Sequence, residues 1–314
     1  MATYSKTLFN AGNYSAFRPT YPRALYEFLY RYHQSTPSAQ WKRVVDLGCG
    51  PGQATVELTK FEEIIGVDPS EAMITKAKEL LKSHPSSGLS KITYVKGQAE
   101  NLEHLEAESV DMVVTAQAAH WFNYDRLWPQ LARVLRKEGT VALWGYSQFR
   151  IDGHPYLTPL IHEYSKGSDP INSIGPYWEE PGRSILDNHY LDIPKAPTEY
   201  FKNHEHIFWT GDYHPNLPSP KPILLRKRGS WESLQAYLRT FSSLFTYHEA
   251  HPNDKEQFTG LSQRPASGHG EKQGDIVERL WWTLKETVAK ENNGDEGSEI
   301  EIVWPTAMLL FKKK

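Results

Sequence analysis

The sequence predicts an α/β protein whose first half is a doubly wound parallel sheet. Short apolar runs alternate with amphipathic stretches between about residues 41 and 146, which is the pattern of successive strand and helix units. A glycine-rich turn follows the first apolar run, and an acidic residue ends the second. Because ligands bind at the carboxyl ends of the strands in such sheets, these two features indicate a nucleotide-type site.

Five apolar runs are the predicted strands of this sheet: residues 44–47, 64–67, 92–95, 110–116 and 140–144. Apolar residues between the strands recur at helical spacing and predict one helix after the glycine turn, one after the second strand and one before Gly139. The buried faces of these helices are expected to contain Ala54, Leu58 and Phe61; Met73, Ala77 and Leu80; and Leu127, Leu131, Val134 and Leu135.

The second half of the chain has a different pattern. After Tyr146 the alternation stops, and Pro, Tyr, Trp and His are frequent up to about residue 228, which predicts a cap. Helices are expected over residues 231–247 and 275–290, with a mobile polar loop over 259–275 between them. Residues 300–304 and 307–311 are predicted strands that return to the sheet edge.

Composition narrows the function classes. Lys plus Arg number 35 and Asp plus Glu number 38, so the positive charge typical of a nucleic-acid-binding protein is missing. No apolar run approaches the roughly 18 residues of a membrane span, and the first residues do not resemble a secretory signal. A single cysteine and 13 scattered histidines predict neither a disulfide nor a metal site. The expected protein is cytoplasmic and acts on a small molecule.

The glycine turn has the spacing G-x-G-x-G, with Gly48, Gly50 and Gly52 in the segment VVDLGCGPGQAT. A dinucleotide-binding fingerprint, G-x-G-x-x-G, requires its third glycine where this chain has Gln53. The spacing therefore disfavours a nicotinamide-dependent oxidoreductase.

Two acidic residues accompany the turn. Asp68 ends the second strand, where a carboxylate can accept hydrogen bonds from both ribose hydroxyls. Its alternative role is the N-cap of the next helix, with Pro69 at the first helical position. Asp46 is expected to contact the cofactor, and its alternative role is to shape the glycine turn.

These residues resemble the class I S-adenosylmethionine-dependent methyltransferases, whose first motif is an acid followed by G-x-G-x-G. The resemblance implies a Rossmann-like sheet with an inserted helical, aromatic-rich acceptor lobe, and S-adenosyl-L-methionine as cofactor. The glycine turn would face the methionine part and Asp68 the ribose. The segment GQAENL would supply Ala99 and Glu100 next to the adenine, although Glu100 could also be a surface residue, and Gln117 would lie beside the sulfonium.

The implied domains are a cofactor-binding core with an N-terminal lid segment over residues 1–146 and an acceptor-binding lobe over 147–298. The lobe is expected to include a late sheet strand near 204–209, and residues 299–314 are expected to return to the sheet as C-terminal strands.

A closer resemblance is to the fungal trans-aconitate methyltransferases, which esterify carboxylates of small polyacids. The matching segments are YSAFRPTYP, AAHWF, LWGY, GPYWEEPGRS, KPILLRKR and YLRTFSSLFTYHE. The polar insertion around residues 259–275 and the sparsely matched stretch 185–220 depart from that pattern. These departures leave the acceptor, and the number of methyl groups that it receives, open.

Carboxylate methylation is chemically consistent with this chain. A carboxylate is already a nucleophile at pH 7, so the enzyme needs to orient it rather than deprotonate it. Arg183 and Arg239 are the expected acceptor-binding arginines, because a guanidinium can hold a carboxylate through two parallel hydrogen bonds. Each could instead be a structural ion-pair partner.

Further site residues follow from the same resemblance. His120 and Trp121 follow the fourth strand, and His120 is expected to hydrogen-bond the acceptor; as a base it would serve a phenol, thiol or amine. Tyr14, Arg18 and Tyr21 are expected to close over cofactor or acceptor, and Trp178 and Trp304 to wall the pocket or fill the core. A noncatalytic cofactor-binding regulator is the remaining alternative, and the sequence predicts no oligomeric state.

Overall fold

The computed structural model describes residues 17–83, 91–260 and 274–314. The described residues form two compact units. One, the sheet unit, contains residues 20–83, 91–148, 181–225 and 304–314, and the other, the helical unit, contains residues 17–19, 149–180, 226–260 and 274–303.

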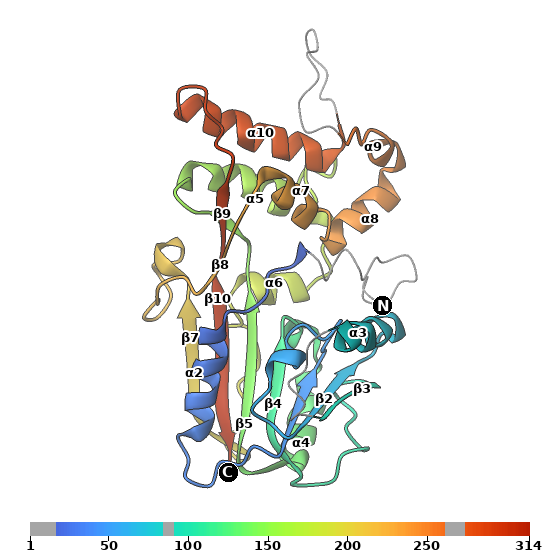
Figure 1. Ribbon diagram of the computed structural model, residues 1–314, viewed down its shortest axis with the longest axis vertical. Helices are drawn as coiled ribbons and strands as arrows, with labels where there is room; N and C mark the ends of the chain where they lie inside the picture. Colours follow the sequence, from blue (N-terminus) through green and yellow to red (C-terminus); the bar gives the residue numbers. More distant parts are fainter. Residues whose placement is uncertain (1–16, 84–90, 261–273) are drawn as a thin grey trace. The chain divides into compact units, whose positions relative to one another are not determined.

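The sheet unit contains a seven-stranded sheet in the order β3-β2-β1-β4-β5-β10-β7, which confirms the predicted Rossmann-like α/β fold (Figure 1). The first five strands run parallel, and β10 is antiparallel to both of its neighbours. The strands are β1 (Arg43–Leu47), β2 (Glu63–Asp68), β3 (Lys91–Lys96), β4 (Val110–Ala116), β5 (Leu135–Tyr146), β7 (Phe201–Trp209) and β10 (Thr306–Lys313).

The C-terminal strands differ from the prediction. Only β10 joins the large sheet, and it lies inside the sheet, where Thr306 pairs with both Tyr146 of β5 and Trp209 of β7. The preceding strand, β9 (Ile300–Trp304), pairs instead with β6 (Arg150–Ile151) in a separate sheet. Pro305 separates the two strands, and its carbonyl oxygen accepts a 2.8 Å hydrogen bond from the amide of Ser147.

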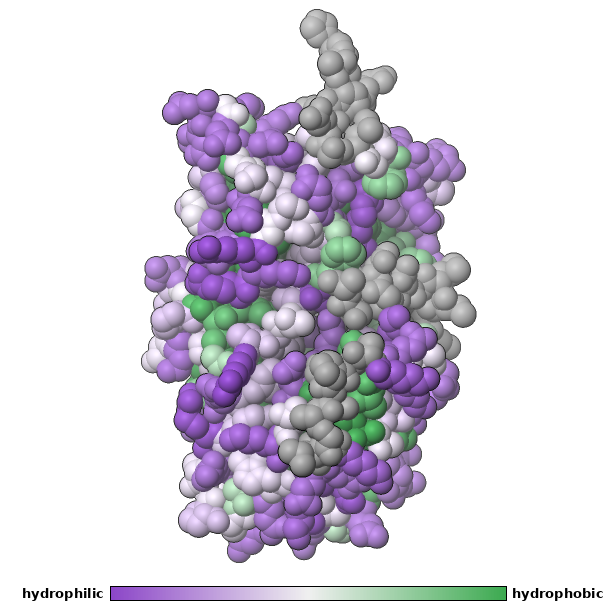
Figure 2. All heavy atoms as spheres, in the orientation of Figure 1, coloured by the Kyte–Doolittle hydropathy of each residue, from purple (hydrophilic) through white to green (hydrophobic). Residues whose placement is uncertain are grey.

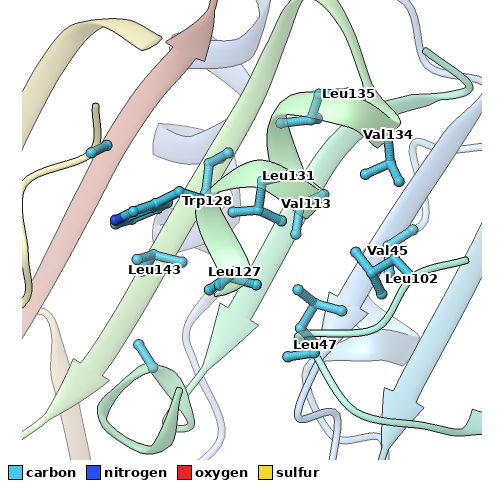
Figure 3. Close-up of a cluster of buried hydrophobic side chains, with 14 of the residues drawn as sticks. Val45, Leu47, Leu102, Val113, Leu127, Trp128, Leu131, Val134, Leu135 and Leu143 are labelled. Atoms are coloured by element: carbon cyan, nitrogen blue, oxygen red, sulfur yellow. The ribbon is translucent and has the colours of Figure 1, made fainter. Parts of the chain in front are cut away.

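Side chains of the sheet alternate between two buried faces, as the pleat requires. Val45 belongs to the face covered by α4 (Tyr124–Val134), and Val44 belongs to the face covered by α2 (Arg23–Gln34). Figure 3 shows the α4 side, where one face of the helix packs against β1, β4 and β5. The side chains in contact there are Leu127, Trp128, Leu131 and Val134 of α4 and Val45, Leu47, Val113 and Leu143 of the strands.

The helix predicted directly after the glycine turn is wrong. The structure has only a 3-10 turn, Thr55–Glu57, because the amides of Glu57 and Leu58 bond the carbonyls of residues three positions earlier and the backbone leaves the helical region at Leu58. Ala54, Leu58 and Phe61 are nevertheless buried together. Their spacing therefore predicted burial correctly and helicity incorrectly.

Helix α3 (Glu71–Ser83) follows β2 as predicted. Its first turn is capped by Ser70, whose Oγ accepts from the amide of Met73 at 3.4 Å, and not by Asp68. A short helix, α6 (Gly182–Asp187), completes the sheet unit.

The helical unit has a small sheet in the order β6-β9-β8, with β8 covering Leu225–Gly229. Its helices are α5 (Thr158–Lys166), α7 (Trp231–Leu238), α8 (Ser242–Ala250), α9 (Pro252–Glu256) and α10 (Ile276–Glu291). The single helix predicted over 231–247 is wrong, because Phe241 has an extended backbone and Thr240 turns back to bond the carbonyl of Tyr237.

Asp275 caps α10 in a capping box with Glu278, close to the predicted start of this helix. Of the predicted mobile loop over 259–275, residues 261–273 lie outside the described residues.

Among the described residues, no helix is long and apolar enough to cross a membrane. The face shown in Figure 2 is covered mainly by hydrophilic residues, with small hydrophobic areas between them.

Candidate cofactor and acceptor sites

The glycine turn adopts a backbone that favours glycine. Gly48, Gly50 and Gly52 have φ values of 67°, 53° and 86°, all in the left-handed region. The amides of Gly48 and Cys49 donate to the carbonyl of Val67 at 2.8 and 3.1 Å, so the turn is tied to the end of β2.

Each glycine also has its own steric environment. A Cβ at Gly48 would lie 2.5 Å from Cβ of Ala118, and one at Gly52 would lie 2.3 Å from Oη of Tyr94. A Cβ at Gly50 would meet nothing within 4 Å. The open space at Gly50 lies at the carboxyl end of β1, where α/β sheets bind ligands.

Asp68 joins the turn to the second strand. Its Oδ2 accepts from the amide of Gly50 and its Oδ1 from the amide of Ser70, both at 2.9 Å. Burial raises the pKa of the Asp68 carboxyl, and these two backbone bonds oppose that shift. The carboxylate has further lone pairs, which can accept hydrogen bonds from the ribose hydroxyls.

Asp46 lies beneath the turn and is completely buried. Its Oδ2 accepts a 2.7 Å hydrogen bond from Oγ1 of Thr55, while Oδ1 has no hydrogen-bond partner among the described residues. Burial raises the pKa of Asp46 to about 7, against the effect of the Thr55 bond and with a smaller contribution from Asp68. Both the cofactor contact and the turn-shaping role remain compatible with this position.

The predicted adenine segment lies next to Asp68. The amide of Gly97 donates to the Asp68 carbonyl at 3.1 Å, and Ala99 is buried. Oε1 of Glu100 accepts a 2.8 Å bond from the amide of Asn123, the residue that caps α4. Glu100 therefore connects this segment to the start of that helix.

Gln117 connects the ends of β4 and β5. Its backbone is left-handed, with φ of 61°, and its amide donates to the carbonyl of Trp144 at 2.8 Å. The side chain accepts from the amide of Tyr146 at 2.8 Å and donates to its carbonyl at 3.0 Å. These bonds give the predicted sulfonium neighbour a defined orientation.

His120 lies in the 3-10 turn Ala119–Trp121 after β4. Its Nδ1 is buried and has no hydrogen-bond partner among the described residues, and its ring stacks on Tyr190 at 6.4 Å. Burial lowers the pKa of His120 to about 3; Arg183 acts in the same direction and Asp187 opposes it. The imidazole is therefore neutral at pH 7.

Arg183 lies in α6, where it forms an ion pair with Asp187 and a hydrogen bond with Gln148. Its Nε donates to Asp187 at 2.8 Å, and its Nη2 donates to Oε1 of Gln148 at 2.7 Å. The side chains of Arg183 and Asp187 are only 12% and 14% exposed, so the guanidinium is held in a largely buried position.

The other predicted arginines belong to the helical unit. Arg239 makes two hydrogen bonds to Asp275, of 2.6 and 3.0 Å, which is the structural ion pair that the sequence left open. Arg18 is buried, donates to the carbonyl of Thr240 at 3.1 Å, and lies 5.3 Å from the ring centre of Phe241.

The predicted aromatic residues have different surroundings. Trp178 donates from Nε1 to the carbonyl of Ser165 and packs against Phe241, as Arg18 does. Tyr21 packs edge-on against Trp144, and Trp121 remains partly exposed beside Gly182. Trp304 is fully buried in the sheet unit and packs edge-on against Tyr146. Tyr14 lies outside the described residues.

Sequence reasoning missed Asp187 and Gln148, which hold Arg183, and Ser147 and His189, which contact each other after β5 and α6. The four-residue spacing of Arg183 and Asp187 is typical of an ion pair within a helix and could have predicted that contact. No sequence signal indicates Gln148, Ser147 or His189, because Gln148 and Ser147 meet their partners Arg183 and His189 across 35 and 42 residues of chain.

Within the described residues, no group of three or more His, Cys, Asp and Glu side chains is arranged to hold a metal ion.

Known proteins resemble this chain over nearly its whole length. The methyltransferase domain family matches residues 45–143. A Dictyostelium discoideum protein named as a methyltransferase is 32% identical over 305 residues, which are 96% of this chain and 92% of the relative. The chain belongs to the class I S-adenosylmethionine-dependent methyltransferases.

Two further comparisons agree with this family. The Saccharomyces cerevisiae protein CRG1, named as an S-adenosylmethionine-dependent methyltransferase, is 34% identical over 188 residues. That match covers 60% of this methyltransferase and 62% of CRG1, so it spans less than two thirds of the relative. A solved structure from Anaeromyxobacter dehalogenans, described as a type II methyltransferase, is 25% identical with a TM-score of 0.61 and covers 94% of this chain and 97% of that one.

This methyltransferase uses S-adenosylmethionine and transfers its methyl group to an acceptor. The alternative of a nicotinamide-dependent oxidoreductase is therefore wrong, as is that of a noncatalytic regulator. The residues fit the cofactor, because the turn leaves open space at Gly50 and the buried Asp68 carboxylate lies directly beside it.

Proposed function

We propose that this methyltransferase esterifies a carboxylate of a small di- or tricarboxylic acid. The observation that carries the proposal is the arrangement around His120. Its buried Nδ1 has no hydrogen-bond partner in the described part of the chain, and the guanidinium of Arg183, which is fixed by Asp187, is the nearby cation that acts on this ring. A cation and a neutral imidazole that can donate from Nδ1 suit an anionic acceptor.

Bound S-adenosylmethionine supplies an electrophilic methyl group, which a carboxylate oxygen can attack without losing a proton. In the proposed site the Asp68 carboxylate accepts hydrogen bonds from the two ribose hydroxyls. The glycine turn faces the methionine part of the cofactor, and Gln117 lies next to the sulfonium. Arg183 and the Nδ1–H of His120 orient the acid. Proximity and orientation are the main contributions required of the protein, because the nucleophile is already ionised.

The low basicity of His120 argues against the alternative acceptors. A phenol, thiol or amine must lose a proton, and a group with a pKa of about 3 is a weak general base at pH 7. Methylation of such O, S or N nucleophiles with His120 as base is therefore the second candidate. It would require the acceptor complex to raise the pKa of His120.

The two predicted acceptor arginines are proposed to have different roles. Arg239 is paired through two hydrogen bonds with Asp275, which caps α10, so we assign it to the stability of the helical unit. Arg183 is assigned to the acceptor, with Asp187 and Gln148 fixing its orientation. Tyr21 and Trp121, both in the sheet unit, stay as proposed acceptor-pocket residues.

The decisive experiment is an acceptor screen with methyl-labelled S-adenosylmethionine. The panel pairs each small mono-, di- and tricarboxylic acid, trans-aconitate among them, with its amide, and adds phenols, thiols and amines. We expect label transfer only to the acids, in a product that releases methanol in alkali as a methyl ester does. Label in a base-stable product from a phenol, thiol or amine, with no transfer to any acid, would overturn the proposal.

A further inference from the structure

We infer that Tyr190, held by His189 at the end of helix α6, is a positioning residue that fixes His120 and Gln117 for methyl transfer. The inference rests on the proposed roles of these two residues beside the acceptor and the sulfonium. All the contacts that carry it lie within the sheet unit.

The backbone at the end of α6 is unusual. His189 and Tyr190 have φ values of 53° and 64°, so two consecutive residues other than glycine are left-handed. The amides of His189 and Tyr190 donate to the carbonyls of Leu186 and Ile185 at 3.1 and 3.0 Å, the pattern of a Schellman helix end. Glycine is the usual residue there, and conformations of this kind persist only where the surroundings hold them.

His189 is held from three sides. Its Nε2 lies 3.0 Å from Oγ of Ser147, which follows β5. Its carbonyl oxygen accepts a 2.9 Å bond from Nε2 of His206 in β7, and its ring lies 4.3 Å from that of His214. Contacts from three separate segments therefore maintain the turn that places Tyr190.

Tyr190 is 1% exposed and fits against Gly145 of β5. A Cβ at Gly145 would lie 2.2 Å from Oη and 2.8 Å from Cζ of Tyr190. The same Cβ would lie 3.0 Å from Oε1 of Gln117, the atom that accepts from the amide of Tyr146. Position 145 must therefore be glycine for the Tyr190 ring and the Gln117 amide to lie side by side.

The ring of Tyr190 also contacts His120. Its ring is nearly parallel to that of Tyr190, with 26° between the planes, and Arg183 and Asp187 are the charged groups that act on it. The hydroxyl end of Tyr190 thus lies beside the side chain of Gln117, and its ring stacks on that of His120. One buried side chain supports both residues that follow β4.

A double-mutant cycle tests this role. We expect Gly145→Ala to lower kcat by about tenfold or more, with the dissociation constant of S-adenosylhomocysteine changed by no more than about threefold. In a Tyr190→Leu background, which removes the ring that the new methyl group would strike, Gly145→Ala should add less than about a twofold further loss. Tyr190→Phe, which keeps the ring, should lose less than Tyr190→Leu.

A second measurement is independent of the acceptor. In protein with isotope-labelled histidine, the ring signals of His120 are assigned from their absence in His120→Asn. We expect both Gly145→Ala and Tyr190→Leu to shift these signals and to move the pKa of His120 upward, toward its ordinary value of about 6.5. Tyr164→Leu, a buried tyrosine of the helical unit, is the matched control for general destabilisation and should not shift them.

Equal losses for Gly145→Ala in both backgrounds, or unchanged His120 signals in a folded Tyr190→Leu protein, would overturn the inference. Failure of the proposed function would look different. The carboxylic acids would then receive no methyl group in the wild-type enzyme, while the His120 signals would still respond to Tyr190.

Discussion

The amide of Gly50 donates a 2.9 Å hydrogen bond to Oδ2 of Asp68, so the glycine turn after β1 is held by the carboxylate that ends β2. The other oxygen of the same carboxylate accepts from Ser70 at the start of α3. One buried acid therefore sets the positions of both backbone segments that surround the proposed ribose site.

Replacement of Asp68 should weaken cofactor binding. Asp68→Ala removes the proposed ribose acceptor and leaves two amides without their bonds, so we expect a loss of about 1–3 kcal/mol, or roughly tenfold to a hundredfold in the dissociation constant. Titration calorimetry with S-adenosylhomocysteine measures it. Glu71→Ala, which removes an exposed acid three residues further on, is the control. Equal affinities of the folded Asp68 variant and the wild type would contradict the ribose assignment.

Gly50 and Gly153 form a matched pair for testing the glycine turn. Both have a left-handed backbone, with φ of 53° and 75°, and neither would have a neighbour within 4 Å of an added Cβ. Gly50→Val and Gly153→Val should therefore cost similar backbone energy. Only Gly50→Val should abolish cofactor binding, because its side chain would occupy the ligand's space. Retained S-adenosylhomocysteine binding in Gly50→Val, measured by calorimetry, would remove Gly50 from the site.

Asp46 should make the stability of the protein depend on pH. The pKa of Asp46 is about 7 in the folded protein and 3.8 in an unperturbed aspartate. At a pH between 3.8 and 7, Asp46 is therefore ionised in the unfolded chain but still protonated in the folded protein. The wild type should therefore lose stability relative to Asp46→Asn as the pH rises from about 4 to 7, by on the order of 2–4 kcal/mol. Above that range the difference should be constant.

Urea unfolding of both proteins at a series of pH values from 4.5 to 8.5 measures this effect. Parallel stability curves for wild type and Asp46→Asn would show that Asp46 is ionised throughout and that the inferred effect of burial is wrong.

Arg239→Met should affect mainly the stability of the protein, whereas Arg183→Met should also affect methyl transfer to the acceptor. Arg239→Met leaves the buried Asp275 carboxylate unpaired, so we expect a loss of about 3–5 kcal/mol in the free energy of unfolding. Arg183→Met also removes the ion pair with Asp187 and should cost some stability. In addition it should lower kcat/KM for the acceptor by about 2–4 kcal/mol in transition-state energy, with little change in cofactor affinity. Denaturant unfolding and steady-state kinetics on both variants distinguish these roles. The assignment fails if Arg239→Met is stable and loses acceptor affinity.

The rate should be nearly independent of pH above the pKa of the acceptor. No proton has to leave a carboxylate, and His120, with a pKa of about 3, does not titrate between pH 6 and 8.5. His120→Asn should lower kcat/KM less than Arg183→Met does, and its pH profile should stay flat. A steep rise between pH 6 and 8 that disappears in His120→Asn would instead show base catalysis and favour a phenol, thiol or amine.

Much of the sheet was predictable because its signals are local. Each parallel strand is a short apolar run, and the left-handed turn at Gly48, Gly50 and Gly52 needs glycine for reasons of backbone sterics. The prediction was wrong where length and long-range pairing decide the structure. The turn at Thr55–Glu57 is short because the backbone leaves the helical region at Leu58, and β10 lies inside the sheet because it pairs with both β5 and β7.

The sequence by itself determined the fold class, the glycine turn and the acid that follows it, since each depends on neighbouring residues and on the short-range chemistry of strands and turns. Only the tertiary structure decided which partner each charged or aromatic side chain has. It pairs Arg239 with Asp275, Arg183 with Asp187 and Gln148, and Tyr190 with the space above Gly145. The physical reason is that most of these contacts join residues from distant segments of the chain. The spacing of residues in the sequence predicts contacts between near neighbours only.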